Sequence, residues 1–210
     1  MTVEILLAFA ATEAALSLIP GPAVLVVVSQ GMTGGRAPSA WAALGVIAGN
    51  LLCFAISATG VGALLLASYD LFFAVKWAGA AYLIYLGVKT WRAPPEATFA
   101  PSDVGGRHRG GSSFMHGFLT QAANPKSILF FAALLPQFVD PGGDVTVQLA
   151  LLGGVSIAIE LPILFAYGRL GGQALRLAAR PRLFRLVHRG AGSLLVLAGV
   201  GLAALRRAEG

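Results

Sequence analysis

Two carboxylates lie deep inside stretches of sequence that are otherwise apolar. Glu13 lies in the run "LAFAATEAALSLIP", and Glu160 lies in "LLGGVSIAIELPILFAYG". An ionisable side chain at the centre of a membrane helix costs about 2.5–3.5 kcal/mol on insertion scales, so such a residue is a functional candidate by default. We therefore take Glu160 and Glu13 as candidates for proton coupling or ammonium binding. A protonated, hydrogen-bonded packing residue is the alternative for Glu13.

Two prolines interrupt the first apolar stretch, in the sequence "SLIPGPAVLVVV". Because proline has no amide hydrogen, Pro20 and Pro22 leave two earlier carbonyls, those of Leu16 and Leu18, without their helical partners. Gly21 lies between the prolines, and Pro22 suits the first position of a new helix. The sequence therefore predicts a helix that unwinds here and restarts inside the membrane.

A second apolar stretch is interrupted in the sequence "QAANPKSILFF". Pro125 suits the first position of a restarted helix, and Asn124 suits the capping position before it. A helix N-terminus carries free amides and about half a positive charge, so it attracts carboxylates and phosphates, and Lys126 adds a full charge. We expect the free amides of residues 23–25 and 126–128 to face a shared region that binds an anionic group. A simple kink between packed helices is the alternative for each break.

Polar side chains recur on one face of several apolar stretches. Asn50 and Gln121 are candidates for substrate contact, and hydrogen bonding between helices is the alternative for both. The helical spacing predicts four polar faces: Glu13 with Ser17 and Pro20; Gly117 with Gln121 and Asn124; Asn50 with Ser57; and Ser156 with Glu160 and Tyr167.

The composition is that of a polytopic membrane protein. Of the 210 residues 57% are hydrophobic and 11% are charged, and the mean hydropathy is +0.78; an ordinary soluble domain has roughly 25% charged residues. Several stretches are long enough to cross a hydrocarbon core of ~30 Å. The prediction is an all-α protein of six transmembrane helices, at roughly 3–28, 39–67, 69–91, 113–138, 146–168 and 187–205.

The distribution of charge predicts the orientation in the membrane. The net charge of +6 comes from basic residues between stretches one and two, three and four, and five and six. The positive-inside rule places these connections in the cytoplasm, so the charge gives no reason to expect a nucleic-acid partner. Arg206 and Arg207 run against this orientation. Residues 169–189 alternate Leu and Ala with Arg, which indicates either an amphipathic segment on anionic lipids or the topology rule alone.

The chain divides into two halves that resemble each other. Residues 92–112, rich in Pro, Gly and charge, predict a cytoplasmic linker between one unit of three helices at 1–91 and another at 113–210. A shift of 112 residues aligns 75–88 with 187–200, and a shift of 103 aligns the two proline breaks. A three-helix unit that is repeated once must have its second copy upside down, which is the inverted repeat of many secondary transporters.

Patterns for catalysis or metal binding are scarce. The three histidines lie in the linker or at the ends of apolar stretches, and none lies beside an intramembrane Ser or Cys. The sequence has no Walker loop, no HExxH and no CxxC. Cys53 is typical of a small packing residue, and the carboxylates show no compact ligand spacing. The sequence therefore predicts no enzyme, no cofactor and no metal site.

Three segments together resemble the lysine exporter (LysE/RhtB) family of bacterial amino-acid exporters. They are "IPGPAVLVVVSQGMTGGRAPSAWAALGVIAGN", "KWAGAAYLIYLGVKTW" and "GFLTQAANPKSILFFAALLPQFVDP". The resemblance implies a protein of the bacterial inner membrane that exports amino acids or close derivatives, coupled to the proton motive force, and it allows for a homodimer. By match to the motifs, it implies a functional core of Pro20, Gly21, Pro22, Asn124, Pro125 and Lys126.

One position departs from that family pattern. Many members carry a polar residue directly after the proline–glycine–proline motif, whereas this chain has Ala23. We therefore expect backbone contacts there and no side-chain contact. The hypothesis is that the substrate carboxylate meets the restarted helix N-termini, and that the ammonium or a coupling proton meets Glu160 or Glu13. A divalent-cation exporter of the same superfamily and a non-transporting membrane scaffold are the rival hypotheses.

Overall fold

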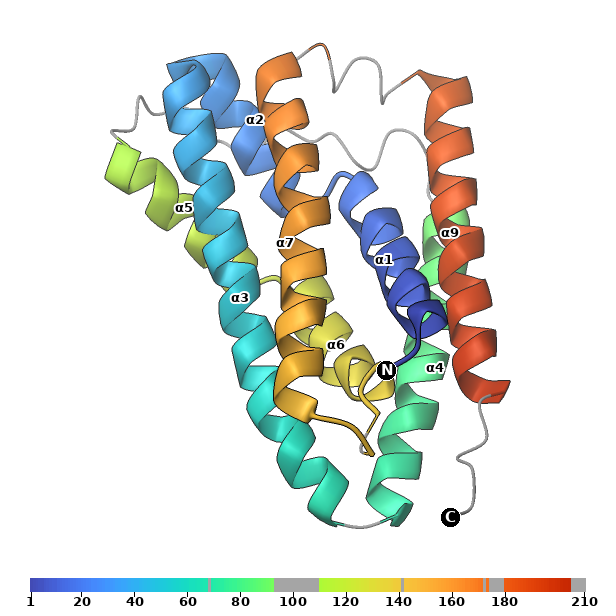
Figure 1. The fold of residues 1–210 in the computed structure, drawn as a ribbon. Helices are drawn as coiled ribbons and strands as arrows, with labels where there is room; N and C mark the ends of the chain where they lie inside the picture. Colours follow the sequence, from blue (N-terminus) through green and yellow to red (C-terminus); the bar gives the residue numbers. More distant parts are fainter. Residues whose placement is uncertain (68, 93–109, 141, 172, 174–179, 205–210) are drawn as a thin grey trace.

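The computed structural model describes residues 1–67, 69–92, 110–140, 142–171, 173 and 180–204. These residues are helical throughout, with short turns and no strand (Figure 1). The elements are α1 (Val3–Leu18), α2 (Pro22–Gly34), α3 (Arg36–Ala67), α4 (Tyr69–Trp91), α5 (Gly110–Ala122), α6 (Pro125–Leu134), the 3₁₀ turn η2 (Leu135–Gln137), α7 (Val145–Leu170) and α9 (Pro181–Ala204). The all-α prediction is confirmed for this part of the chain.

Each predicted apolar stretch corresponds to one helix or to one broken pair of helices. By length and apolarity α3 and α7 are each able to cross a membrane, and α1 with α2 forms a third such segment, bent by 52° at the break. In Figure 1 the segments run alternately up and down: α1 and α2 rise, α3 descends, α4 rises, α5 and α6 descend, α7 rises and α9 descends. The crossing of a membrane by all six segments stays a prediction.

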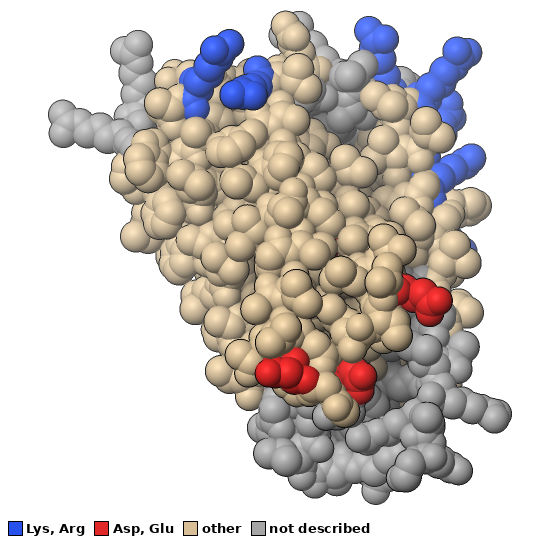
Figure 2. All heavy atoms as spheres, viewed as in Figure 1, with Lys and Arg blue, Asp and Glu red and all other residues tan. Residues whose placement is uncertain are grey.

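Basic and acidic side chains gather at opposite ends of the described structure (Figure 2). Arg36 begins α3, Arg169 lies in the last turn of α7, and Arg182 lies in the first turn of α9. Asp140 and Asp144 lie at the opposite end, just before α7. Residues 182–189, part of the predicted amphipathic segment, form the first turns of α9. Residues 172 and 174–179 of that segment, and residues 93–109 of the predicted linker, lie outside the described residues.

Two glycines let the backbones of α3 and α5 come into contact. A Cβ atom added to Gly45 of α3 would overlap the carbonyl of Phe114, and one added to Gly117 of α5 would overlap the carbonyl of Ala42. Small residues of this kind allow close helix packing in membranes, where no hydrophobic force draws helices together. The contact fixes α5, and therefore the second break, against the middle of α3.

Helices α4 and α9 contact each other through residues that correspond under the shift of 112 residues. A Cβ atom on Gly87 would lie 2.8 Å from Val196, and one on Gly199 would lie 2.8 Å from Ile84. Gly199 is the counterpart of Gly87 under this shift, and Val196 is the counterpart of Ile84. The same pair of contacts thus occurs twice with the roles of the helices exchanged, as a two-fold relation requires.

Two apolar clusters lie on either side of a polar layer. One cluster joins α1, α6 and the middle of α3, and it includes Phe9 and Cys53; the ring of Phe9 meets that of Phe138 edge-on at 5.2 Å. The other joins α2, α3 and α7 and includes Ile47. Asn50 lies in α3 between Ile47 and Cys53, and its side chain is buried. The polar side chain of Asn50 therefore lies between two apolar clusters.

Candidate functional site

The predicted break in the first apolar stretch is present. The last residue of α1 is Leu18, Ile19 and Gly21 have extended backbone, and α2 begins at Pro22. The two carbonyls that were predicted to lose their helical partners are bound by side chains from elsewhere. The Nζ atom of Lys126 donates to the Leu16 carbonyl at 2.9 Å, and the Tyr167 hydroxyl donates to the Leu18 carbonyl at 3.0 Å.

The second break is capped in the way the sequence predicts. Pro125 begins α6, and the Oδ1 atom of Asn124 accepts a hydrogen bond from the Lys126 amide at 3.0 Å. The Asn124 carbonyl accepts from the amides of Ser127 and Ile128, each at 3.1 Å. The prediction of free amides at residues 126–128 is therefore wrong, because Asn124 binds all three.

The start of α2 has no side-chain cap. Gly21 has no side chain to cap it, and only the amide of Leu25 bonds back to the Gly21 carbonyl, at 3.0 Å. Within the described residues the amides of Ala23 and Val24 have no hydrogen-bond partner. Of the amides predicted to be free at residues 23–25, those of Ala23 and Val24 are free in the part of the chain that the structure describes, and the prediction is wrong for Leu25.

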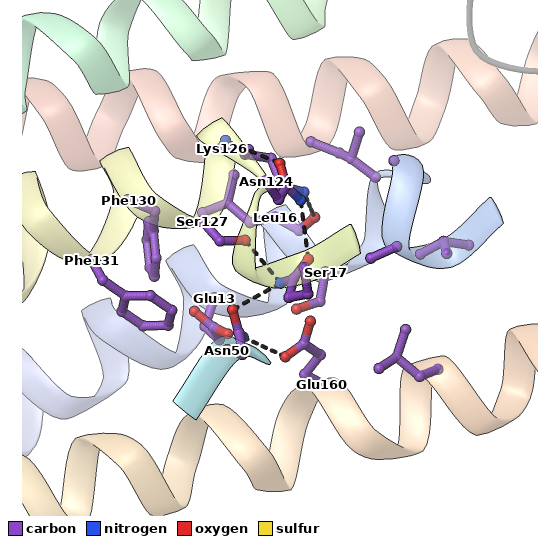
Figure 3. A pocket seen from close by; sticks show the side chains of 16 residues that line it. Glu13, Leu16, Ser17, Asn50, Asn124, Lys126, Ser127, Phe130, Phe131 and Glu160 are labelled. Carbon is purple, nitrogen blue, oxygen red and sulfur yellow. Dashed lines mark hydrogen bonds between the residues drawn. The ribbon is translucent and has the colours of Figure 1, made fainter. Parts of the chain in front are cut away.

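A polar cavity lies between the two breaks (Figure 3). Its polar lining comes from Glu13, Ser17, Asn50, Gln121, Asn124, Lys126, Ser127 and Glu160, and Gly21, Ala23 and Val24 border it. Its volume is about 40 Å³, the room of a few water molecules at ~10–15 Å³ each. A larger molecule can occupy it only if the surrounding helices separate.

Most of the predicted site residues meet in this cavity, and a few lie elsewhere. Pro20 borders a second, apolar cavity, whereas Pro22 and Pro125 act through the backbone as the first residues of α2 and α6. Ser57, seven residues after Asn50 in the continuous helix α3, does not line this cavity, and its hydroxyl donates to the Phe131 carbonyl at 2.6 Å.

A chain of amides connects the second break to one carboxylate. The Nδ2 atom of Asn124 donates to Oε1 of Gln121 at 3.1 Å, and Nε2 of Gln121 donates to Oδ1 of Asn50 at 2.8 Å. The Nδ2 atom of Asn50 then donates to Oε2 of Glu160. These contacts tie α5, α3 and α7 together, so Asn50 and Gln121 bond between helices and also line the cavity.

The two carboxylates are held by neutral partners. The Ser156 hydroxyl donates to Oε1 of Glu13 at 2.8 Å, and the side chains of Glu13 and Glu160 are both buried. In the described part of the chain neither carboxylate has a Lys or Arg nitrogen within 4.0 Å. Lys126 nonetheless lies near enough to interact electrostatically with both. The cavity therefore holds two acceptors for a cation and one separate cationic donor.

Sequence reasoning did not identify Ser127, whose hydroxyl accepts a hydrogen bond from Nε2 of Gln121 at 2.8 Å. Nothing in the helical spacing reveals this pair, because it depends on how the chain turns between α5 and α6. Among the described residues no group of three or more His, Cys, Asp or Glu side chains is placed to hold a metal ion.

Known proteins resemble this chain along almost its whole length. The family model of the LysE type translocator matches residues 14–206. The chain belongs to the LysE-type translocator family. No solved structure matches it.

Several curated relatives are similar to this chain over most of its length. A homoserine/homoserine lactone efflux protein of Salmonella typhi is 32% identical over 211 residues, covering 99% of this chain and 100% of the relative. An uncharacterized membrane protein of Pseudomonas aeruginosa is 38% identical over 200 residues, covering 89% and 88%. An uncharacterized membrane protein of Vibrio cholerae is 32% identical over 205 residues, covering 97% and 98%.

Proposed function

We propose that this translocator exports an amino acid or a close derivative across the bacterial inner membrane, with its arginine-rich end in the cytoplasm. The observation that carries the proposal is the polar cavity, which lies among apolar helices at the point where both broken segments meet. The family and the relatives named for homoserine and homoserine lactone efflux support the substrate class. The end-to-end separation of basic and acidic side chains supports the orientation.

The groups of the cavity complement the two charges of an amino acid. A substrate carboxylate would accept from the unpaired amides at the start of α2 and from Lys126, which would exchange the Leu16 carbonyl for a charged acceptor. Hydrogen bonds to charged groups are worth about 1.5–3 kcal/mol, more than bonds between neutral groups. The ammonium would donate to Glu13 and Glu160. Both ends of the substrate would then lose water and gain charged partners together.

Coupling to the proton motive force is part of the same proposal. A buried carboxyl can release its proton when an ammonium arrives and take one up when the ammonium leaves. Glu160 is the candidate because Asn50 links it, through Gln121, to the second break. Replacement Glu160→Gln keeps the shape and the acceptor oxygen but removes the exchangeable proton. We expect export by this variant to be lost or to become insensitive to collapse of the proton gradient; unchanged, gradient-driven export would remove Glu160 from the mechanism.

The proposed architecture is six membrane spans in two inverted halves, joined by the predicted cytoplasmic linker at 92–112, whose last three residues form the start of α5. The exchanged contacts of Gly87 with Val196 and of Gly199 with Ile84 support it, since they relate α4 and α9 by the repeat. In this arrangement the two restarted helices point in opposite directions from one cavity.

Export from living cells tests the proposed function. Cells that lack their own exporters are fed a panel of dipeptides, which load single amino acids internally, and the amino acids inside and outside are measured. We expect expression to lower one or more intracellular amino acids and to raise them outside. Pro125→Ala restores an amide at the start of α6 and should abolish the effect. If no amino acid moves, the substrate class is wrong.

A further inference from the structure

A second cavity, half open and lined in part by the exposed Leu18 and Leu170, lies beside the polar one and is almost wholly apolar. Its volume is about 240 Å³, and it lies between the end of α1, the second half of α7 and the first turns of α9. Its lining includes Leu18, Pro20, Ile163, Tyr167, Phe184 and His188. It has ample room for an apolar side chain, which the polar cavity lacks.

At the first break, only the short extended segment between α1 and α2 separates the two cavities. Ile19 and Gly21 line the polar cavity, whereas Leu18 and Pro20 line the apolar one. Alternation of this kind follows from extended backbone, which sends successive residues to opposite sides; Ile19 has φ −80° and ψ 113°.

Helix α7 supplies the rest of the partition. Glu160 and Leu164 line the polar cavity, and Ile163 and Tyr167 line the apolar one. The Tyr167 hydroxyl bonds to the Leu18 carbonyl at 3.0 Å and so holds the unwound segment against α7. Displacement of this short segment would join the two cavities into one.

A lipid with an anionic headgroup fits the apolar cavity less well than a substrate does. The cavity face of α9 consists of Leu183, Phe184, Val187 and His188. The arginines of these turns, Arg182, Arg185 and Arg189, lie three or four residues apart on the opposite face of the helix. There the Arg189 guanidinium lies over the Trp91 ring, 5.2 Å from its centre. The described residues that line the apolar cavity include no Lys, Arg, Asp or Glu, whereas the polar cavity, across the unwound segment, has Glu13, Glu160 and Lys126 in its lining.

We propose that the apolar cavity receives the side chain of the transported amino acid while its charged groups occupy the polar cavity, and that the apolar cavity sets the upper size of the side chain that is exported. This inference rests on the proposed function. The unwound segment 19–21 is then the element that moves to admit the substrate, and the lining of α9 determines specificity.

Val187 offers a matched pair of tests, because it lines the apolar cavity and does not touch the polar one. Val187→Phe narrows the cavity and Val187→Ala enlarges it. Leu186→Phe, at a neighbouring side chain that is 70% exposed, is the control. Export is measured for the dipeptide-fed panel, ordered by side-chain volume.

We expect Val187→Phe to lower export of the largest exported amino acid by about tenfold or more relative to the smallest, since one methylene group in an apolar pocket discriminates by 10- to 200-fold. Val187→Ala should extend export to larger side chains, and Leu186→Phe should change neither limit. If the Val187→Phe protein does not accumulate in the membrane, the Val187→Ala result alone tests whether the apolar cavity sets the size limit.

Two results would overturn the inference alone. One is normal export by both Val187 variants with an unchanged size limit. The other is a lipid that copurifies with the wild-type protein and is displaced by Val187→Phe without any change in the size limit. Absence of export by the wild-type protein would overturn the proposed function itself, and the inference with it.

Discussion

Asn124 has two separable contacts, so replacing it tests the construction of the second break. Its Oδ1 atom caps α6 through the Lys126 amide at 3.0 Å, and its Nδ2 atom donates to Gln121 at 3.1 Å. Loss of a cap costs about 0.5–2 kcal/mol. A side-chain hydrogen bond between membrane helices is worth about 0.6 kcal/mol on average and at most about 1.7. Asn124→Ala should therefore lower the free energy of unfolding by about 1–3.5 kcal/mol.

Asn124→Ser separates the two contributions. A serine hydroxyl can still cap α6 but is too short to reach Gln121, so this variant should lose only the smaller part, about 0.6–1.7 kcal/mol. Unfolding is followed in mixed detergent micelles by titration with a denaturing detergent. Ala123→Ser, at the exposed neighbouring position, is the control and should stay within about 0.5 kcal/mol of the wild type. Equal destabilisation by the alanine and serine variants would refute the capping argument, and no destabilisation by either would refute both contacts.

Three further predictions concern packing and the first break. Gly45→Ala places a methyl group against a backbone carbonyl of α5, so we expect little folded protein in membranes; Gly154→Ala, where a Cβ meets nothing within 4 Å, should express normally. Tyr167→Phe removes the hydrogen bond to the Leu18 carbonyl and should lower the free energy of unfolding by about 0.6–1.7 kcal/mol in the same assay. The control is Tyr85→Phe, at an exposed ring, which should lower it by less than about 0.5 kcal/mol. Gly21→Ala should fold as the wild type does, because its φ of −126° suits any residue and a Cβ there has open space; a loss of folded protein, measured by size-exclusion chromatography, would contradict this.

The sequence predicts the first break well, because proline acts on its own backbone neighbours. Pro20 and Pro22 identify Leu16 and Leu18 as the residues whose carbonyls need new partners. The partners themselves could not be predicted. Lys126 follows Leu16 by 110 residues, and only the packing of α6 and α7 against α1 brings such distant side chains to the break.

Where the sequence prediction of the site is wrong, a competing local interaction explains it. The amides at the start of α6 were expected to be free, but Asn124 both caps the helix and accepts from its first turn. The Asn124 side chain binds only the Lys126 amide, whereas its backbone carbonyl binds the amides of Ser127 and Ile128. Gly21, at the equivalent position, has no side chain to bind the Ala23 amide, so this part of the asymmetry follows from one residue difference. The pairing of Ser127 but not Val24 depends on how the backbone turns at each break.

Binding of the amino acid to the purified protein shows whether the polar cavity is its site. The ligand is the amino acid found to be exported, in radiolabelled form, and the variants are Lys126→Met and, as the control, the exposed Arg185→Met. We expect saturable binding by the wild type and by Arg185→Met, and an affinity about ten- to a hundredfold lower for Lys126→Met, the equivalent of one lost charged hydrogen bond. Wild-type affinity in a folded Lys126→Met protein would show that the amino acid does not bind in the polar cavity through Lys126.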